Sequence, residues 1–171
     1  MNKKGFTILE LLGAILVISI GVLTAYGVVQ RIITYTIDSS DRIVAAYLVK
    51  EGVEIVRNIR DTNWINNRDF DFGIIDASCL LGYWEIEYNE LNLACCSSCD
   101  GTDDFNDLRF LKVNASGYYS YSFGGTNSKF KRKITITPDG VDKLKVIVDV
   151  FWKKRTQISS IRVQENIYDW K

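Results

Sequence analysis

The residue with the clearest chemical signature is Glu10, a lone carboxylate in the apolar run from Phe6 to Val29. Apart from Glu10, this run is polar only at Thr7, Ser19 and Thr24. A carboxylate held in an apolar environment is costly unless a cation pairs with it. Glu10 is therefore expected to serve a function; the alternative is an acid that lies close enough to the membrane interface to stay hydrated.

A second group that could do chemistry comprises four cysteines: Cys79, Cys95, Cys96 and Cys99. Four cysteines allow three disulfide pairings. Because a bond between the adjacent Cys95 and Cys96 would be strained, we expect Cys79 to pair with one of them and Cys99 with the other. The alternatives are a four-thiolate zinc site, for which only Cys96 and Cys99 have C-x-x-C spacing, and free thiols.

Acidic residues follow these cysteines in the stretch "CDGTDDFND", at Asp100, Asp103, Asp104 and Asp107. Their spacing does not fit the calcium loop D-x-[DN]-x-[DN]-G. We therefore expect a solvated acidic loop, with calcium binding as the alternative, and we assign neither a metal site nor a cofactor.

The composition argues against several functions. The 171 residues contain no histidine, which removes the commonest general base and every Ser-His or Cys-His nucleophile pair. Lys+Arg and Asp+Glu both number 21, so the chain lacks the basic bias of a nucleic-acid-binding protein. The local basic stretch "KFKRK", Lys129 to Lys133, is expected to be a solvated strand face.

The apolar run has the length of a membrane span. A helix from Phe6 to Val29 would be about 36 Å long, enough to cross a hydrocarbon core of about 30 Å. The alternative is a cleaved secretory signal, but the apolar region of such a signal is shorter than this run and is followed by small residues at a cleavage site. Lys3 and Lys4 precede the run, so we expect a single pass with a cytoplasmic N terminus and the rest of the chain outside.

The stretch "KKGFTILELL" resembles the class III signal of type IV pilins and type II secretion pseudopilins. The resemblance rests on the basic leader, Gly5, Phe6, Glu10 and the apolar run. It implies that a membrane prepilin peptidase cuts between Gly5 and Phe6 on the cytoplasmic side and that the new amine of Phe6 is methylated. It also implies a partner for Glu10, the Phe6 amine of a neighbouring subunit in a filament. This pair would make Glu10 a residue that sets the axial register of one subunit against the next.

One position departs from the family. Major pilins often carry a proline where this chain has Gly27. Glycine also loosens a helix, by about 1 kcal/mol relative to alanine. Melting of the helix at this position during assembly is therefore left open.

Beyond the span, the helical pattern continues from Arg31 to about Arg60. Apolar residues recur at three-, four- and seven-residue spacings, which predicts an amphipathic helix that packs on a sheet. They are Ile37, Val44, Leu48, Ile55 and Ile59. On the other face, Lys50–Glu54 and Arg57–Asp61 are opposite-charge pairs at i,i+4.

The remainder of the chain predicts antiparallel strands. "YWEIEY" from Tyr83, "FLKV" from Phe110 and "YYSYSF" from Tyr118 are strand-like, with a turn at Asn114 to Gly117. The strands "KRKITIT" and "KLKVIVDVFWK" flank a turn at Pro138-Asp139-Gly140. In the second of these, four apolar residues share one face: Val146, Val148, Val150 and Trp152. The end of the chain, "ISSIRVQENIYDW", is a further strand or a short helix.

These elements predict an α+β pilin fold, in which a long N-terminal helix packs on a C-terminal antiparallel sheet. The expected parts are a leader (1–5), a membrane half of the helix (6–30), an amphipathic half (31–62) and an extracytoplasmic head (63–171). The closing strands also resemble those of I-type minor pseudopilins and V-type minor pilins.

The sequence therefore predicts the precursor of a minor type IV pilin or pseudopilin, a structural filament subunit and not an enzyme. Its expected partners are prepilin peptidase, other pilin subunits, the inner-membrane assembly platform and membrane lipid. The alternatives are a major pilin of the same machine, or a membrane-tethered binding or enzymatic domain with a pilin-like N terminus.

Overall fold

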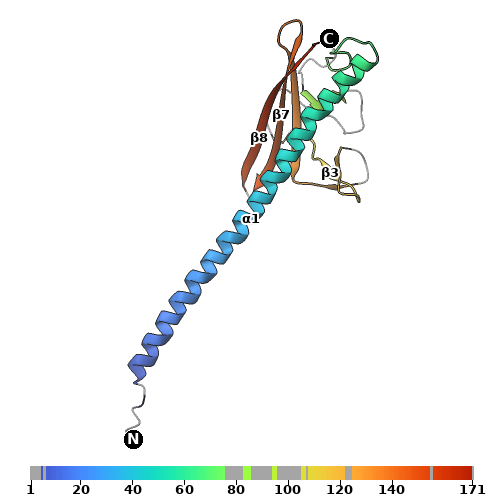
Figure 1. Ribbon diagram of the computed structural model, residues 1–171. Coiled ribbons are helices and arrows are strands. Elements are labelled where there is room, and N and C mark those ends of the chain that lie inside the picture. The colour runs from blue at the N-terminus through green and yellow to red at the C-terminus, as the bar shows by residue number, and fades with distance from the viewer. Residues whose placement is uncertain are drawn as a thin grey trace. The chain divides into compact units, whose positions relative to one another are not determined.

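The computed structural model describes residues 5, 7–75, 83–85, 94–95, 105–106, 108–121, 125–154 and 156–170 (Figure 1). One long helix, α1 (Ile8–Ile65), is followed by strands, which confirms the predicted α+β class. The chain divides into two compact units, Met1–Asp41 and Arg42–Lys171. The first unit contains the N-terminal part of α1, and the second contains the rest of α1 and the strands.

The strands form two antiparallel sheets. A five-stranded sheet has the order β2-β1-β6-β7-β8, and a three-stranded sheet has the order β4-β3-β5. The larger sheet comprises β1 (Tyr83–Glu85), β2 (Ala94–Cys95), β6 (Phe130–Pro138), β7 (Lys143–Lys154) and β8 (Gln157–Tyr168). The smaller comprises β3 (Lys112–Val113), β4 (Tyr119–Ser120) and β5 (Thr126–Asn127).

The turn between β6 and β7 sets the register of these two strands. Asp139 donates its backbone N–H to Lys143 at 2.9 Å, and Gly140 has a φ of 97°, a conformation that glycine adopts without steric cost. The resulting register pairs Ile134 with Val148. The hairpin predicted at Pro138-Asp139-Gly140 is confirmed, and β8 shows that the end of the chain is a strand.

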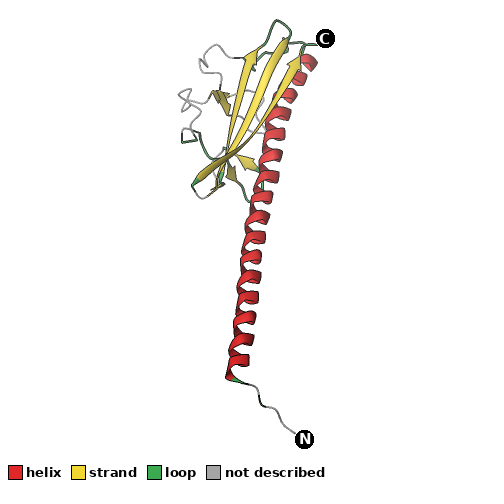
Figure 2. Ribbon diagram, turned by 90° about the vertical axis from the view of Figure 1, so that its left-hand side faces the viewer, coloured by secondary structure: helices red, strands yellow, loops and turns green. Residues whose placement is uncertain are grey.

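The core of the second unit lies between α1 and one face of the larger sheet (Figure 2). The predicted apolar face of β7 is confirmed, since Val146, Val148, Val150 and Trp152 are all buried. From α1, Leu48, Ile55 and Ile59 are buried as predicted, whereas Ile37, in the first unit, is exposed.

Gly52 allows the helix to approach the sheet closely. A Cβ atom at this position would lie 2.9 Å from Cγ1 of Val148 and 3.3 Å from Cδ1 of Ile134. Both neighbours are fully buried, so they have little room to move. A side chain at position 52 would therefore push α1 away from the strands.

Gly52→Val is expected to destabilise the second unit by about 1–3 kcal/mol, because it overpacks this contact. Thermal unfolding of the full chain in detergent micelles, followed by circular dichroism, measures the effect. Asn58→Val is the matched control, since it places the same side chain on an exposed position of the same helix. Equal melting temperatures for the two variants would contradict the close approach.

The basic stretch at Lys129 to Lys133 is not the solvated face that its composition suggests. Lys131, Arg132 and Lys133 on β6 are buried, with only 4%, 1% and 4% of their surface exposed. Arg132 points toward α1, where its Nη1 donates to the Leu48 carbonyl oxygen at 3.3 Å and lies 3.4 Å from Glu51 Oε1. The expectation is therefore wrong for these three residues.

Charges of alternating sign cross the opposite face of the sheet. Lys133 lies opposite Asp149 in the register of β6 and β7, and Asp149 lies opposite Arg162 on β8. Arg162 donates to both Asp149 oxygens, through Nε at 2.6 Å and Nη2 at 3.2 Å. On β1, Trp84 pairs with Ile134 of the antiparallel strand β6. The next residue, Glu85, therefore lies at the level of Lys133 and extends the row of charges to β1. We call Glu85, Lys133, Asp149 and Arg162 the charge row.

The ion pairs on α1 also differ from the prediction. Arg57 contacts Glu54 at 2.7 Å and Glu165 on β8, while Asp61 accepts a hydrogen bond from Arg60 Nε at 2.9 Å. Among the described residues, no ion pair joins Glu54 to Lys50. The predicted pairs were based on spacing along the helix alone, and the cross-contact to Glu165 exists only because β8 lies beside α1.

The residues after β8 contact the C-terminal end of α1. The Arg60 guanidinium lies 4.5 Å from the Trp64 ring centroid and 5.8 Å from that of Trp170. The two tryptophan rings meet edge to face at 5.2 Å, and Trp64 Nε1 donates to Asp169 Oδ1 at 3.3 Å. We call these contacts the C-terminal clasp.

Candidate processing and assembly site

The N terminus of α1 is capped by Thr7. Its carbonyl oxygen accepts from the backbone N–H groups of Glu10 and Leu11, both at 3.1 Å, and its Oγ1 accepts from the Glu10 N–H at 3.3 Å. Threonine at the cap followed three residues later by glutamate is the capping-box pattern. The sequence signal for this helix start is "TILE", Thr7 to Glu10, and the cap was not predicted from it.

Glu10 lies in the first turn of α1, and its side chain is exposed within the first unit. A carboxylate at this end of a helix is stabilised by the backbone N–H groups and the helix dipole. Among the described residues, no ion pair reaches the Glu10 carboxylate. Gly5 is described and exposed, whereas Phe6, on the other side of the expected cleavage bond, lies outside the described residues.

The surface of α1 in the first unit is apolar and exposed. Its large hydrophobic residues up to Ile33 are all about half exposed or more. Two hydroxyl side chains in this stretch are satisfied within the helix: Ser19 Oγ donates to the Ile15 carbonyl oxygen at 2.7 Å, and Thr24 Oγ1 donates to the Ile20 carbonyl oxygen at 2.9 Å. This helix is long and apolar enough to cross a membrane. It can place Glu10 at membrane depth while leaving few polar groups exposed to lipid.

The second candidate group, the cysteines, is placed only in part. Cys79, Cys96 and Cys99 lie outside the described residues, and of Cys95 only the backbone is described, opposite Trp84 in β2. The disulfide pairing therefore stays a prediction. The acidic loop with Asp100, Asp103, Asp104 and Asp107 also lies outside the described residues. Within the described part of the chain, no cluster of three or more acidic, cysteine or histidine residues could hold a metal ion.

Comparison with known proteins gives one finding, and it covers this N-terminal site. Residues 1–26 match the family described as the prokaryotic N-terminal methylation motif. No curated protein and no solved structure matches the chain. The matched motif implies prepilin cleavage and methylation, processing by prepilin peptidase and assembly with other pilins. The chain therefore carries, in its first 26 residues, the prepilin signal of type IV pilins and pseudopilins, which supports a type IV pilin-like precursor.

Proposed function

We propose that the chain is the precursor of a minor type IV pilin or pseudopilin, a structural subunit of a filament assembled from the membrane. The observation that carries this proposal is that the methylation motif leads directly into α1, whose apolar surface is exposed in the first unit and whose later turns form part of a folded second unit. A filament subunit needs a helix that lies first in lipid and then among neighbouring helices. It also needs a head whose core is formed by residues of the same chain.

In this proposal, prepilin peptidase cuts between Gly5 and Phe6 on the cytoplasmic side and methylates the new amine. The leader is 1–5, the membrane half of the helix is 6–30, the amphipathic half is 31–62, and 63–171 form the extracytoplasmic head. The assembly platform of the inner membrane then transfers the subunit from lipid into the filament. The family to which the signal belongs is structural and not enzymatic.

Glu10 has two tasks in this proposal. Within its own chain its backbone N–H donates to Thr7 Oγ1, and its carboxylate lies in the first turn of α1, where the helix dipole favours a negative charge. In the filament, its carboxylate pairs with the Phe6 amine of a neighbour. Because an unpaired charge among packed helices is costly, this pair favours one axial stagger of the subunits.

The choice of a minor subunit rests on the resemblance of the closing strands to I-type and V-type minor subunits. The residues that carry this resemblance lie in the hairpin β6–β7, the strand β8 and the tail with Trp170. Gly27, where major pilins often carry proline, is consistent with the same choice.

Replacing Gly5 tests the processing step. Gly5→Leu is expected to block cleavage, because a branched side chain at the cut bond prevents its entry into the peptidase, and Gly5→Ala should be cleaved poorly at most. The measurement is mass spectrometry of the N-terminal peptide in membranes that contain the peptidase. The unaltered chain should begin at a methylated Phe6.

Gly13→Leu is the matched control, since Gly13 lies in the same apolar helix and a Cβ atom there meets nothing within 4 Å. This variant should be cleaved normally. A mature chain that begins at Met1, or that is cut after Ala25 as a secretory signal would be, contradicts the proposed function.

A further inference from the structure

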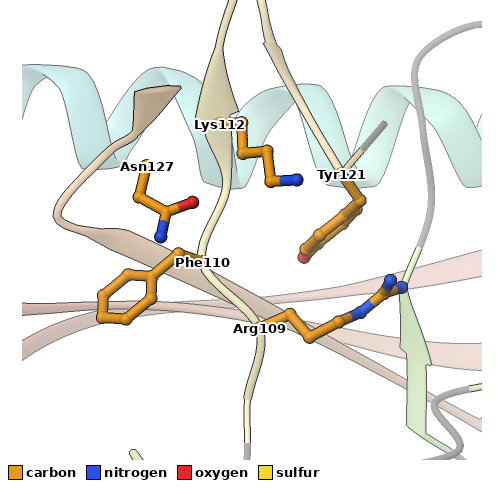
Figure 3. Close-up of a pocket in the computed structure, with 5 residues that line it drawn as sticks. All are labelled: Arg109, Phe110, Lys112, Tyr121 and Asn127. Carbon is orange, nitrogen blue, oxygen red and sulfur yellow. The ribbon is translucent and has the colours of Figure 1, made fainter. Parts of the chain in front are cut away.

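The second unit has two features that the filament role of α1 does not use. One is a pocket of about 440 Å³ beside the three-stranded sheet (Figure 3), whose described lining is Arg109, Phe110, Lys112, Tyr121 and Asn127. The other is the outer edge of β8, where the larger sheet ends (Figure 1). The pocket lining is chemically mixed, whereas the edge presents one repeating pair of backbone groups, and this repetition defines the kind of partner that fits it.

The register of β7 and β8 determines which backbone groups of β8 point away from the sheet. Asp169 donates its backbone N–H to the Asp142 carbonyl oxygen at 2.8 Å, so these two residues form a hydrogen-bonded pair next to the pair of Lys143 and Tyr168. In an antiparallel ladder, hydrogen-bonded and non-hydrogen-bonded pairs alternate. The pairing of β7 with β8 is continuous along the strand. Every even-numbered residue of β8 therefore directs its N–H and C=O to the outer edge.

The outer edge of β8 is open in the described part of the chain. Among the described strands only β7 pairs with β8, and no backbone group of a described turn or loop bonds to it. Arg162 is not counted in this edge, because its side chain is engaged with Asp149. We call the open edge the backbone N–H and C=O groups of the other even-numbered residues, all of which are exposed: Ile158, Ser160, Gln164, Asn166 and Tyr168.

The sequence of β8 does not protect the open edge. Edge strands of natural proteins are usually kept short, bent by a bulge, or interrupted by proline or lysine. In contrast, β8 is 12 residues long, contains no proline, glycine or lysine, and pairs with β7 without a bulge. Its charged residues are Arg162 and Glu165, and each forms an ion pair within the second unit. Neither sequence nor charge therefore prevents a further strand from pairing with β8.

Apolar side chains flank the open edge on both faces of the sheet. On the face that packs against α1, Val163 keeps 41% of its surface exposed. On the opposite face, Ile158 and Tyr168 keep 52% and 50% of their surface exposed. Side chains directly opposite each other on neighbouring strands lie about 4.5–5.5 Å apart at Cβ, so a further strand would contact these residues.

We propose that the open edge binds an extended segment of another protein, which adds to the larger sheet as a strand antiparallel to β8. A row of N–H and C=O groups along a strand is matched by the same groups of a second extended chain, and the side chains at alternate positions then determine which segment fits. The segment that fits β8 has β-branched or aromatic residues at alternate positions, to cover Val163 on one face or Ile158 and Tyr168 on the other. It has no proline at the positions that donate to β8.

The other occupant of an open strand edge is the same edge of a second copy. Two β8 strands paired antiparallel would require the two α1 helices to point in opposite directions. In the proposed topology every copy enters the membrane with its N terminus cytoplasmic, so this arrangement is not available there. The assignment to another protein therefore rests on the proposed function, and self-association is an outcome of the test.

The probe is a fluorescein-labelled peptide with the sequence of β7, Lys143 to Lys154, because β7 is the strand that already pairs with β8. Its binding to the full chain in detergent micelles is followed by fluorescence anisotropy. A second peptide has prolines in place of Ile147 and Val150, one on each edge of the strand. It should bind at least about tenfold more weakly, because proline cannot donate to the open edge. This comparison uses the unaltered chain, so it does not depend on the folding of a variant.

Gln164→Pro removes one outward N–H and leaves the bonds to β7 in place, so it should weaken binding of the first peptide about tenfold. Gln164→Thr is the matched control, since it changes the side chain and keeps the N–H, and its affinity should stay within about twofold of the unaltered chain. Thermal unfolding followed by circular dichroism reports whether Gln164→Pro keeps its fold. If it does not, the comparison of the two peptides on the unaltered chain decides.

The proposal is overturned if the first peptide does not bind or if the proline peptide binds equally well. It is also overturned if a folded Gln164→Pro binds as tightly as Gln164→Thr, which is the result expected if the peptide displaces β7 instead. A dimer of the full chain that Gln164→Pro abolishes would make a second copy the occupant, and would overturn the assignment to another protein. Because the test involves neither cleavage nor filaments, failure here leaves the evidence for the proposed function unchanged.

Discussion

Glu10→Ala should yield a subunit that inserts into the membrane, is cleaved normally and is largely excluded from filaments. Removing the carboxylate makes insertion easier, since a charged residue near the centre of a span costs about 2.5–3.5 kcal/mol. In the filament, the same change leaves the neighbour's Phe6 amine without its partner. Breaking a buried ion pair on one side costs about 3–5 kcal/mol, so incorporation should fall by at least a hundredfold.

The measurement is the fraction of processed subunit in sheared filaments relative to the membrane pool. Glu10→Gln keeps the size and part of the hydrogen bonding, so its incorporation should be intermediate. Ser19→Ala is the matched control, because the Ser19 hydroxyl is bonded within its own helix and has no role between subunits in this scheme. A subunit confined to the filament tip lacks one neighbour and would tolerate the loss better. Incorporation of Glu10→Ala at the level of the unaltered chain, away from the tip, would refute the register role.

Asp149→Ala should destabilise the second unit by about 3–5 kcal/mol, the other large effect that we expect. Asp149 is 2% exposed and lies between Lys133 and Arg162 in the charge row. Its removal takes a negative charge away from the position opposite the buried Lys133 and removes both acceptors of the Arg162 guanidinium. Such a loss is a large part of the total stability of a domain of this size.

Thermal unfolding of the full chain in detergent micelles measures this effect. Asp139→Ala is the matched control: Asp139 pairs with Lys143 at 2.6 Å in the exposed hairpin turn, and exposed ion pairs contribute about 0–1 kcal/mol. The double variant Lys133→Met with Asp149→Ala should regain part of the loss, because the ammonium is then absent as well. If Asp149→Ala melts at the same temperature as Asp139→Ala, the charge row contributes nothing to stability.

Much of the fold followed from local patterns in the sequence. The spacing of apolar residues predicted α1, and alternation with a Pro-Asp-Gly turn predicted the β6–β7 hairpin, because periodicity and turn residues act within a few positions of each other. Burial of the basic stretch could not be predicted in this way. Lys133 lies opposite Asp149 on β7, and Lys131 is covered by Phe105 and Phe110. These partners are far from β6 in sequence, so no local pattern reveals them.

The candidate site likewise contains residues that a local motif predicted and features that the sequence did not reveal. Gly5, Phe6 and Glu10 were identified from a short motif, and the match of residues 1–26 to the methylation family agrees with that motif. The capping role of Thr7 was also local, but it becomes apparent only when "TILE" is read as a helix start. The pocket lined by Arg109, Phe110, Lys112, Tyr121 and Asn127 could not be found from the sequence. Asn127 on β5 and Tyr121, directly after β4, come near Lys112 because β4 and β5 pair with β3, and local patterns do not reveal which strands pair.

The C-terminal clasp has a consequence for the order of events during synthesis. The contacts of Arg60 and Trp64 with the C-terminal residues cannot form until Asp169 and Trp170, more than a hundred residues later in the chain, have been synthesised. The strand β8, which completes the larger sheet, is equally late. A ribosome adds about 5–20 residues per second, so several seconds pass between synthesis of the helix and arrival of its last partners. In the proposed topology, the first unit can enter the lipid bilayer during that interval, before the second unit has all the residues that complete its fold.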